Sequence, residues 1–151
     1  MDNPCNTNEQ DCRLNSCLFF SSAKLARVFG KIADEAFRKS GLSPSHALLL
    51  YLVNQRGIMQ QKEIGELLHL TPSTITRFVD KLENKKLIYR KTDGKNVYIS
   101  TTETGLFLQS EIIKAWNDLH AMYKDILTEE ETRQFIALSG KLLRRLENPQ
   151  D

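Results

Sequence analysis

The fold is decided by residues 61–100, which read QKEIGELLHLTPSTITRFVDKLENKKLIYRKTDGKNVYIS. The first part predicts a short helix over about 60–68. Its expected inward positions are Ile64, Leu67 and Leu68, and Gly65 between them is expected to allow close helix packing. A turn follows, and Thr71-Pro72 provides an N-cap and a first-turn proline for a second helix over 72–84. The pattern therefore predicts two helices joined by a tight turn.

A β-hairpin is predicted directly after these helices. Residues 87–91 and 96–100 are short β-rich runs on either side of Thr92-Asp93-Gly94-Lys95. Asp-Gly between two such runs is the strongest short signal for a hairpin. Two helices with a tight turn, followed by a hairpin, predict a winged helix-turn-helix over residues 41–101.

Helical patterns also precede this unit. Residues 16–39 predict a long helix with one apolar seam, and Gly41 is expected to end it in a left-handed conformation. Ser43-Pro44 opens a helix that is expected to run to Gly57. Its apolar residues, 47–53, lie nearly all round it, so we expect this helix to be central.

The chain after the hairpin is predicted to be helical. Thr102 is expected to cap one long helix, in which Ile112, Trp116, Leu119, Tyr123 and Ile126 form a seam. Thr128 and Glu131 form a capping box for a last helix. That helix carries a stripe of Phe135, Leu138, Leu142 and Leu146. The expected fold class is therefore mainly α, with a small β-hairpin wing and flanking helices.

Positive charge gathers in the centre of the chain. The whole chain has a net charge of +2, but residues 70–100 have seven basic and three acidic side chains, net +4. Residues 101–151 have six basic and nine acidic side chains, net −3. This asymmetry suggests a module that faces nucleic acid, attached to an acidic scaffold. We see no signal peptide and no apolar run of membrane-spanning length, so the cytoplasm is the expected location.

One face of the predicted helix over 72–84 is polar and basic. The major groove of B-form DNA admits a helix that presents short polar and basic groups in its N-terminal half. Ser73 and Thr74 lie beside free helix N–H groups, which favour phosphate, and the forked side chain of Arg77 suits guanine or phosphate. The full set of expected DNA contacts is Ser73, Thr74, Thr76, Arg77, Lys81 and Lys85 on the helix, with Arg90, Lys91 and Lys95 on the hairpin.

These residues resemble a known family. The run from Gln61 to Arg77, with Val79, Leu82, Leu87 and Arg90 after it, is similar to the winged helix of the MarR family of bacterial regulators. Asp93-Gly94-Lys95 and Thr102-Glu103-Thr104-Gly105 resemble that family's wing motif Asp-x-Arg and its Thr-x-x-Gly. The resemblance covers about residues 16–147. Lys95 departs from it by replacing the wing arginine, which keeps the charge but loses the planar fork, and the wing is a few residues shorter than usual.

The resemblance implies a homodimeric repressor. Such a protein binds double-stranded DNA at a pseudo-palindromic operator and is released by a small ligand or by oxidation. The three apolar seams outside residues 41–101 support a dimer independently, because a small winged domain cannot cover them. Residues 16–40 and 102–147 are then the dimerisation region. Packing of the three seams within one chain is the alternative.

Two kinds of switch stay open. Cys17 lies near the start of the first predicted helix, where some members of the family sense hydroperoxides, and Cys5 and Cys12, in a flexible tail over 1–15, could act as resolving thiols. The other switch is a pocket for a small aromatic effector between the dimerisation helices and the winged domain. Its candidate lining is Phe19, Phe20, Tyr51, Trp116, His120 and Tyr123, which can equally be plain core.

An enzyme is not indicated. The sequence has no Gly-x-Ser-x-Gly, no phosphate-binding Gly-rich loop and no catalytic pattern of histidines. The histidines and cysteines show no metal-ligand spacing, so we expect no metal and no cofactor. The remaining alternative is a protein-interaction adaptor that has kept the winged fold without binding DNA.

Overall fold

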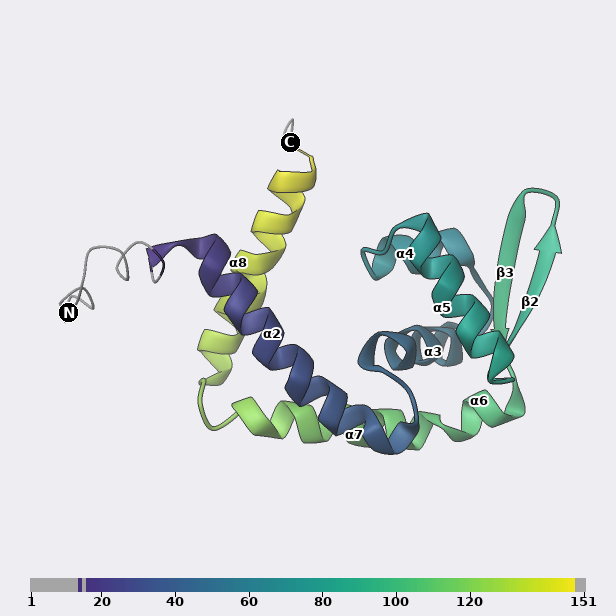
Figure 1. Ribbon diagram of the computed structural model, residues 1–151, viewed down its shortest axis with the longest axis horizontal. Helices are drawn as coiled ribbons and strands as arrows, with labels where there is room; N and C mark the ends of the chain where they lie inside the picture. The colour runs from purple at the N-terminus through teal and green to yellow at the C-terminus, as the bar shows by residue number, and fades with distance from the viewer. Residues whose placement is uncertain (1–13, 15, 149–151) are drawn as a thin grey trace.

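The structure is a computed structural model that describes residue 14 and residues 16–148, so Cys5 and Cys12 lie outside the described residues. Figure 1 shows a winged-helix body at one end and long helices at the other. The elements are α2 (Leu18–Phe37), η1 (Arg38–Ser40), α3 (Pro44–Arg56), β1 (Met59–Gln60), α4 (Gln61–Leu67), α5 (Pro72–Asn84), β2 (Ile88–Asp93), β3 (Asn96–Thr101), α6 (Glu103–Phe107), α7 (Gln109–Tyr123) and α8 (Glu129–Glu147). No helix in this part of the chain is long and apolar enough to cross a membrane.

The predicted hairpin is confirmed. β2 and β3 pair antiparallel from Ile88↔Thr101 to Asp93↔Asn96, which leaves a two-residue turn. Gly94 is its first residue and has a φ of 60°, which glycine adopts at little cost. The strands extend further toward the turn than the sequence predicts, so Lys95 lies at the tip.

A third strand joins this sheet. Met59 and Gln60 of β1 pair with Ile99 and Tyr98 of β3, giving the order β1-β3-β2. Two residues are too few to produce an alternating pattern, so the sequence analysis missed this strand.

The two α helices of the helix-turn-helix end in the same way. After α4, His69 has a φ of 51°, and the N–H of Leu70 donates to the carbonyl of Gly65 at 2.8 Å. After α5, Lys86 has a φ of 59°, and the N–H of Leu87 donates to the carbonyl of Leu82 at 3.0 Å. Both ends are Schellman motifs, in which a non-glycine residue takes the left-handed position that usually belongs to glycine.

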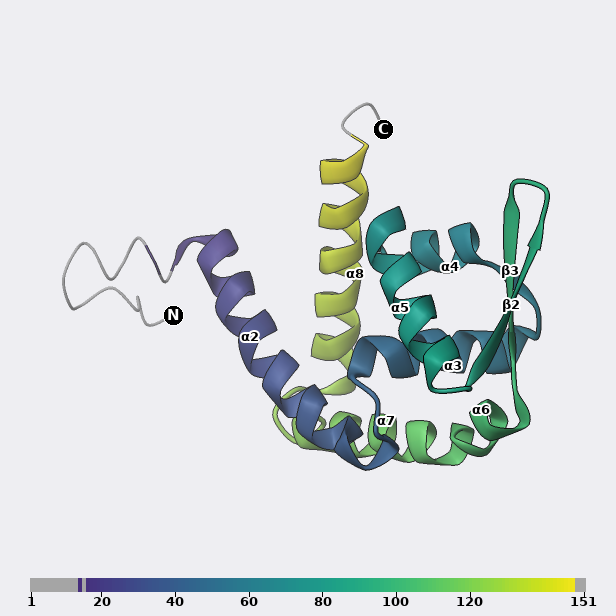
Figure 2. The same ribbon diagram turned by 45° about the vertical axis from the view of Figure 1, so that its right-hand side comes forward.

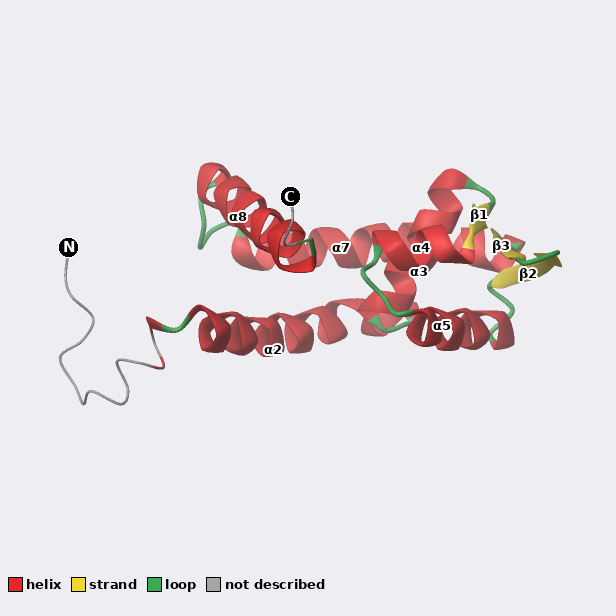
Figure 3. Cartoon of the chain, turned by 90° about the horizontal axis from the view of Figure 1, so that it is seen from above, coloured by secondary structure: helices red, strands yellow, loops and turns green. Residues whose placement is uncertain are grey.

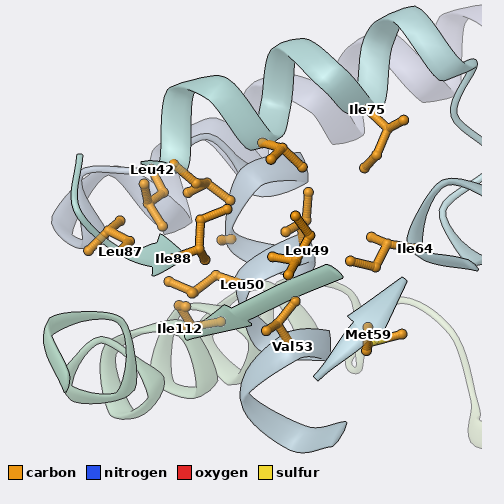
Figure 4. Close-up of a cluster of buried hydrophobic side chains, with 14 of the residues drawn as sticks. Leu42, Leu49, Leu50, Val53, Met59, Ile64, Ile75, Leu87, Ile88 and Ile112 are labelled. Atoms are coloured by element: carbon orange, nitrogen blue, oxygen red, sulfur yellow. The ribbon is translucent and has the colours of Figure 1, made fainter. Parts of the chain in front are cut away.

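The core lies between α3, α5 and the sheet, as Figure 4 shows. The central position expected of α3 is confirmed, because Ala47, Leu49, Leu50 and Val53 are fully buried. The other large side chains of the core that are fully buried come from the remaining elements and are Ile64, Val79, Leu82, Ile88, Ile99 and Ile112.

The inward position predicted for Leu67 is wrong. Leu67 is 45% exposed, whereas Ile64 and Gly65 are buried. The inward face of α4 is centred on Ile64 and Gly65, and Gly65 faces Ile75 of α5. A Cβ at Gly65 would lie 3.5 Å from Ile75 Cγ2, an ordinary packing distance.

The single long helix predicted after Thr102 is also wrong, since Leu108 separates α6 from α7. Thr102 caps α6 as expected, and its hydroxyl also donates to the carbonyl of Lys86 at 2.8 Å. Gly105 is pressed against the start of β2, where a Cβ would lie only 2.2 Å from the carbonyl oxygen of Leu87. α6 is therefore attached to the base of the wing, while Ile112 of α7 packs in the core. The chain turns between these two attachments.

α2 extends away from the body, whereas the end of α8 reaches it, since Glu147 Oε1 lies 3.2 Å from His69 Nδ1 in the turn between α4 and α5. The C-terminal part of α2 packs against α7 while the rest of α2 diverges from it, and α8 leaves the end of α7 in another direction (Figures 2 and 3). The capping box of Thr128 and Glu131 is confirmed. No residue of α8 is buried, and Ile126, expected in the preceding helix, lies beyond α7 and is 76% exposed.

Candidate nucleic-acid interface

The N-terminus of α5 is built by a cap. The Thr71 hydroxyl accepts a hydrogen bond from the Thr74 N–H at 3.3 Å and donates one to Thr74 Oγ1 at 2.9 Å. Pro72 follows the cap as the first residue of the helix. Ser73 is exposed beside these first N–H groups, which carry the positive end of the helix dipole. This end of α5 therefore suits an anion.

The outer face of α5 is exposed and basic. Ser73, Arg77 and Lys81 are exposed, whereas Ile75, Val79 and Leu82 on the opposite face are buried. Neither Arg77 nor Lys81 forms an ion pair within the described residues. The predicted two-faced helix is confirmed, and Arg77 is free to reach another molecule.

The two flanks of α5 differ in charge. On the wing side, Asp80 and Glu83 face Arg90 of β2, which contacts Asp80 and lies 3.5 Å (Nε to Oε2) from Glu83. The Arg90 side chain is only 25% exposed. Among the expected DNA contacts, Arg90 is therefore occupied within the chain, where it holds the wing against α5.

The other flank, toward α3, is basic. Lys85 Nζ donates to the carbonyl of Gly41 at 3.4 Å. Beside it, the buried ring of His46 stacks on Phe78, with 4.2 Å between ring centroids, and its Nδ1 contacts Ser43 Oγ. Burial, and then the charges of Lys81 and Lys85, lower the pKa of His46. His46 is thus a neutral support beneath the basic flank, a role that sequence reasoning missed. The sequence signal for this role was the spacing of three residues between Ser43 and His46 at the start of a helix.

Thr76 is placed differently from its neighbours. Its hydroxyl donates to the carbonyl of Pro72 at 2.9 Å and accepts from Gln61 Nε2 of α4 at 3.1 Å. The side chain is half-buried. It lines a cavity of about 440 Å³ with Lys95 and Val97 of the wing.

The wing supplies two further basic side chains. Lys91 in β2 and Lys95 at the tip are exposed, and neither forms an ion pair within the described residues. Figure 1 shows the hairpin projecting beside α5. The geometry thus brings together Ser73, Arg77 and Lys81 on one face, with Lys85 on one flank and Lys95 on the other.

The six effector-pocket candidates are not brought into one cluster by the ring contacts of the described residues. Tyr51 and Trp116 form one pair, with ring centroids 5.3 Å apart, between α3 and α7. His120 Nδ1 and Tyr123 Oη are 3.0 Å apart near the end of α7. Phe19 and Phe20 contact each other at the start of α2. The set is therefore divided into three pairs.

A large apolar groove lies between α2 and α8. Its volume is about 1050 Å³, and Phe19 is the one effector-pocket candidate in its lining. The groove, called the α2–α8 groove below, is lined by Leu18, Phe19, Ser21, Ser22, Lys24, Leu25, Ala26, Val28, Phe29, Phe135, Ser139, Leu142, Leu143 and Leu146.

Cys17 is the N-cap residue of α2. It is half-buried and has a free thiol, and its side chain makes no capping hydrogen bond. Cys5 and Cys12, the expected resolving thiols, lie outside the described residues. Over residue 14 and residues 16–148, no group of three or more His, Cys, Asp or Glu side chains could hold a metal ion.

Comparisons with known proteins agree with this geometry. The sequence model of the MarR family matches residues 42–96. The HTH-type transcriptional repressor MdtR of Bacillus subtilis (strain 168) is 30% identical over 129 residues, which cover 82% of this chain and 83% of that protein. The HTH-type transcriptional regulator MhqR of the same organism is 31% identical over 132 residues, covering 81% and 86%. The MepR–DNA complex of S. aureus is similar in fold, with a TM-score of 0.75 at 24% identity, over 86% of this chain and 98% of that one.

Proposed function

The chain belongs to the MarR family of transcriptional regulators, and from this premise we propose that it grips double-stranded DNA through α5 and the β2–β3 wing. The observation that carries this proposal is the exposed Arg77 in the N-terminal half of α5, which has no ion pair within the described residues and lies beside the exposed Ser73. A helix that enters the major groove reads base edges from this half. Arg77 contacts guanine or phosphate, and Ser73 and Thr74 contact phosphate.

The flanks contact the DNA backbone. Lys81 and Lys85 approach phosphates on the α3 side, and Lys91 and Lys95 approach them from the wing. Arg90 acts indirectly, because its pairing with Asp80 and Glu83 sets the angle between the wing and α5. A two-residue turn places Lys95 close to the sheet, which limits its reach into the minor groove.

The protein acts as a homodimeric repressor on a pseudo-palindromic operator in the cytoplasm. The exposed leucines and phenylalanines of the α2–α8 groove support the dimer, since a soluble monomer rarely leaves such a surface uncovered. Residues 16–40 and 102–147 serve dimerisation and residues 41–101 bind DNA, although α6 is attached to the base of the wing. A small ligand, or oxidation at Cys17, releases the DNA.

Selection of bound fragments from a random DNA pool tests the proposal, because the recovered half-site spacing also measures the dimer geometry. With the selected operator, Arg77→Ala is expected to weaken specific binding by about 1–3 kcal/mol. Lys85→Ala is expected to weaken binding to all sequences and to lower the slope of log K against log salt by about one.

Lys114→Ala is the matched control. Lys114 lies on α7, outside α5 and the wing, and pairs with Asp118, so this change should leave the binding free energy and the salt slope unchanged. If the affinity for DNA depends neither on the salt concentration nor on the Arg77→Ala change, DNA recognition by α5 is overturned. That result would favour a winged-helix adaptor instead.

A further inference from the structure

Thr76 directly precedes Arg77 in the half of α5 that faces base edges. From its contacts we infer that Thr76 recognises a thymine through its own methyl group, with Gln61 as the positioning residue. The inference rests on the proposed insertion of α5 into the major groove. It adds a specificity for one base, which the family assignment does not contain.

The hydroxyl group of Thr76 is already engaged on both sides. A threonine hydroxyl has one hydrogen to donate, and here the carbonyl of Pro72 receives it at 2.9 Å. Gln61 Nε2 donates to the same oxygen at 3.1 Å. To donate to a base or a phosphate, Thr76 would have to break the bond to Pro72, so its hydroxyl is a poor donor for DNA.

The methyl group is the part of this side chain that is left for contact. Thr76 is half-buried and lines the cavity beside the wing, where Pro72, Ile75 and Val97 provide apolar surface. In the major groove, thymine alone among the four bases presents a methyl group, and threonine methyls are known partners for it. An apolar recess next to a fixed methyl therefore favours thymine over cytosine and over the purines.

Gln61 fixes the rotamer that makes this possible. It is the first residue of α4, and its amide reaches across to α5. Its other amide atom, Oε1, is buried and has no hydrogen-bond partner in the described structure. An unpartnered buried carbonyl costs free energy. Gln61 Nε2 therefore holds the Thr76 oxygen from the α4 side, which fits a role in orienting Thr76.

The test uses the full-length protein and the operator selected above. Each thymine of one half-site is replaced in turn by deoxyuridine, which removes only the methyl group, and the dissociation constant is measured by fluorescence anisotropy. We expect one thymine per half-site at which this replacement weakens binding about fourfold, the factor for one buried methyl. If no thymine is sensitive, the inference is overturned while DNA binding itself stands.

Two substitutions of Thr76 separate the methyl from the hydroxyl. Thr76→Val keeps a methyl and loses the hydroxyl, and the helix itself holds valine to one rotamer, so this variant should retain the thymine-to-uracil ratio. Thr76→Ser keeps the hydroxyl and should bring the ratio to about one. The opposite result, loss of affinity in Thr76→Val and none in Thr76→Ser, would mean that the hydroxyl reads the DNA. Thr74→Ser, the same change on the other flank of α5, is the matched control and should leave the ratio unchanged.

Gln61→Met tests the positioning role. It removes both the hydrogen bond to Thr76 and the unpartnered oxygen at similar volume, so thermal unfolding should change little. We expect the thymine-to-uracil ratio to fall toward one, because only the bond to Pro72 then remains and a helical threonine can exchange that bond for one to the i−3 carbonyl by rotating. An unchanged ratio would overturn the role of Gln61, and a wild-type protein that binds no DNA would overturn the proposed function together with this inference.

Discussion

Apolar side chains are buried in the winged-helix body but exposed in the α2–α8 pair. In the body, Leu49, Leu50 and Ile64 are completely buried, and the sheet and three helices close around them. In the pair, Leu18 is 61% exposed and Leu146 is 76% exposed, although both lie on apolar stripes. The body is complete within one chain. The pair leaves its apolar stripes exposed, and the proposed dimer covers them with a second copy of the chain.

The largest effect is expected from a charge placed in the α2–α8 groove. Leu142→Lys removes an apolar side chain from each subunit and buries two charges at a symmetric interface, so the dimer Kd should rise at least about 100-fold. Analytical ultracentrifugation over a concentration series measures this. Ala137→Lys, which adds the same charge to α8 outside the groove lining, should leave the dimer intact. If the two variants have the same dimer Kd, the α2–α8 groove is not part of the dimer interface.

Within the body, the next largest effect is expected at Gly105. An alanine there would place its Cβ 2.2 Å from the carbonyl oxygen of Leu87, so α6 or the wing must shift. We expect a loss of about 2 kcal/mol in the free energy of unfolding. Gly65→Ala is the control within the same body, since its Cβ would meet only ordinary contacts at 3.5 Å. It should be neutral or stabilising by up to about 1 kcal/mol in chemical denaturation.

Acid is expected to weaken the body through His46. Burial, followed by Lys81 and Lys85, lowers the pKa of His46 in the folded protein. The unfolded chain therefore binds a proton more readily, with a pKa near 6.5, and the stabilising effect of the neutral ring is lost as pH falls below that value. Denaturation at pH 7.5 and 5.5 measures the loss. His46→Gln should reduce it, and His120→Gln, at an exposed position, should not. A pH dependence that survives in His46→Gln would assign it to other groups.

The smallest effect is expected where α5 ends. Lys86 has a φ of 59°, which disfavours any side chain, so Lys86→Gly should raise the free energy of unfolding by about 0.5–1 kcal/mol. Lys85, with a φ of −79°, is the matched neighbour. Lys85→Gly should lower stability, because glycine adds only flexibility there. Thermal melting measures the stability of both variants. Stabilisation by Lys85→Gly would contradict the assignment of backbone strain to Lys86.

Much of the body could be predicted from local signals. Thr71-Pro72 and the Asp-Gly pair act within a few residues of themselves, so the start of α5 and the wing were predicted correctly. The exposed Arg77 followed from the period of α5. The pairing of Arg90 with Asp80, and the double engagement of the Thr76 hydroxyl, could not be predicted. Each depends on how two elements are placed against each other.

By itself, the sequence determined the order of the main helices and the hairpin, the side-chain caps of α5, α6 and α8 and the basic face of α5. The caps and the face depend on neighbours three or four residues away. The tertiary structure decided the strand at Met59–Gln60, the turn at Leu108 and the separation of the six aromatic candidates into pairs. It also decided which cations stay free. Arg90 and Arg77 are the same residue type in one basic stretch. Only the fold places two carboxylates beside Arg90 and, among the residues that the structure describes, none in an ion pair with Arg77.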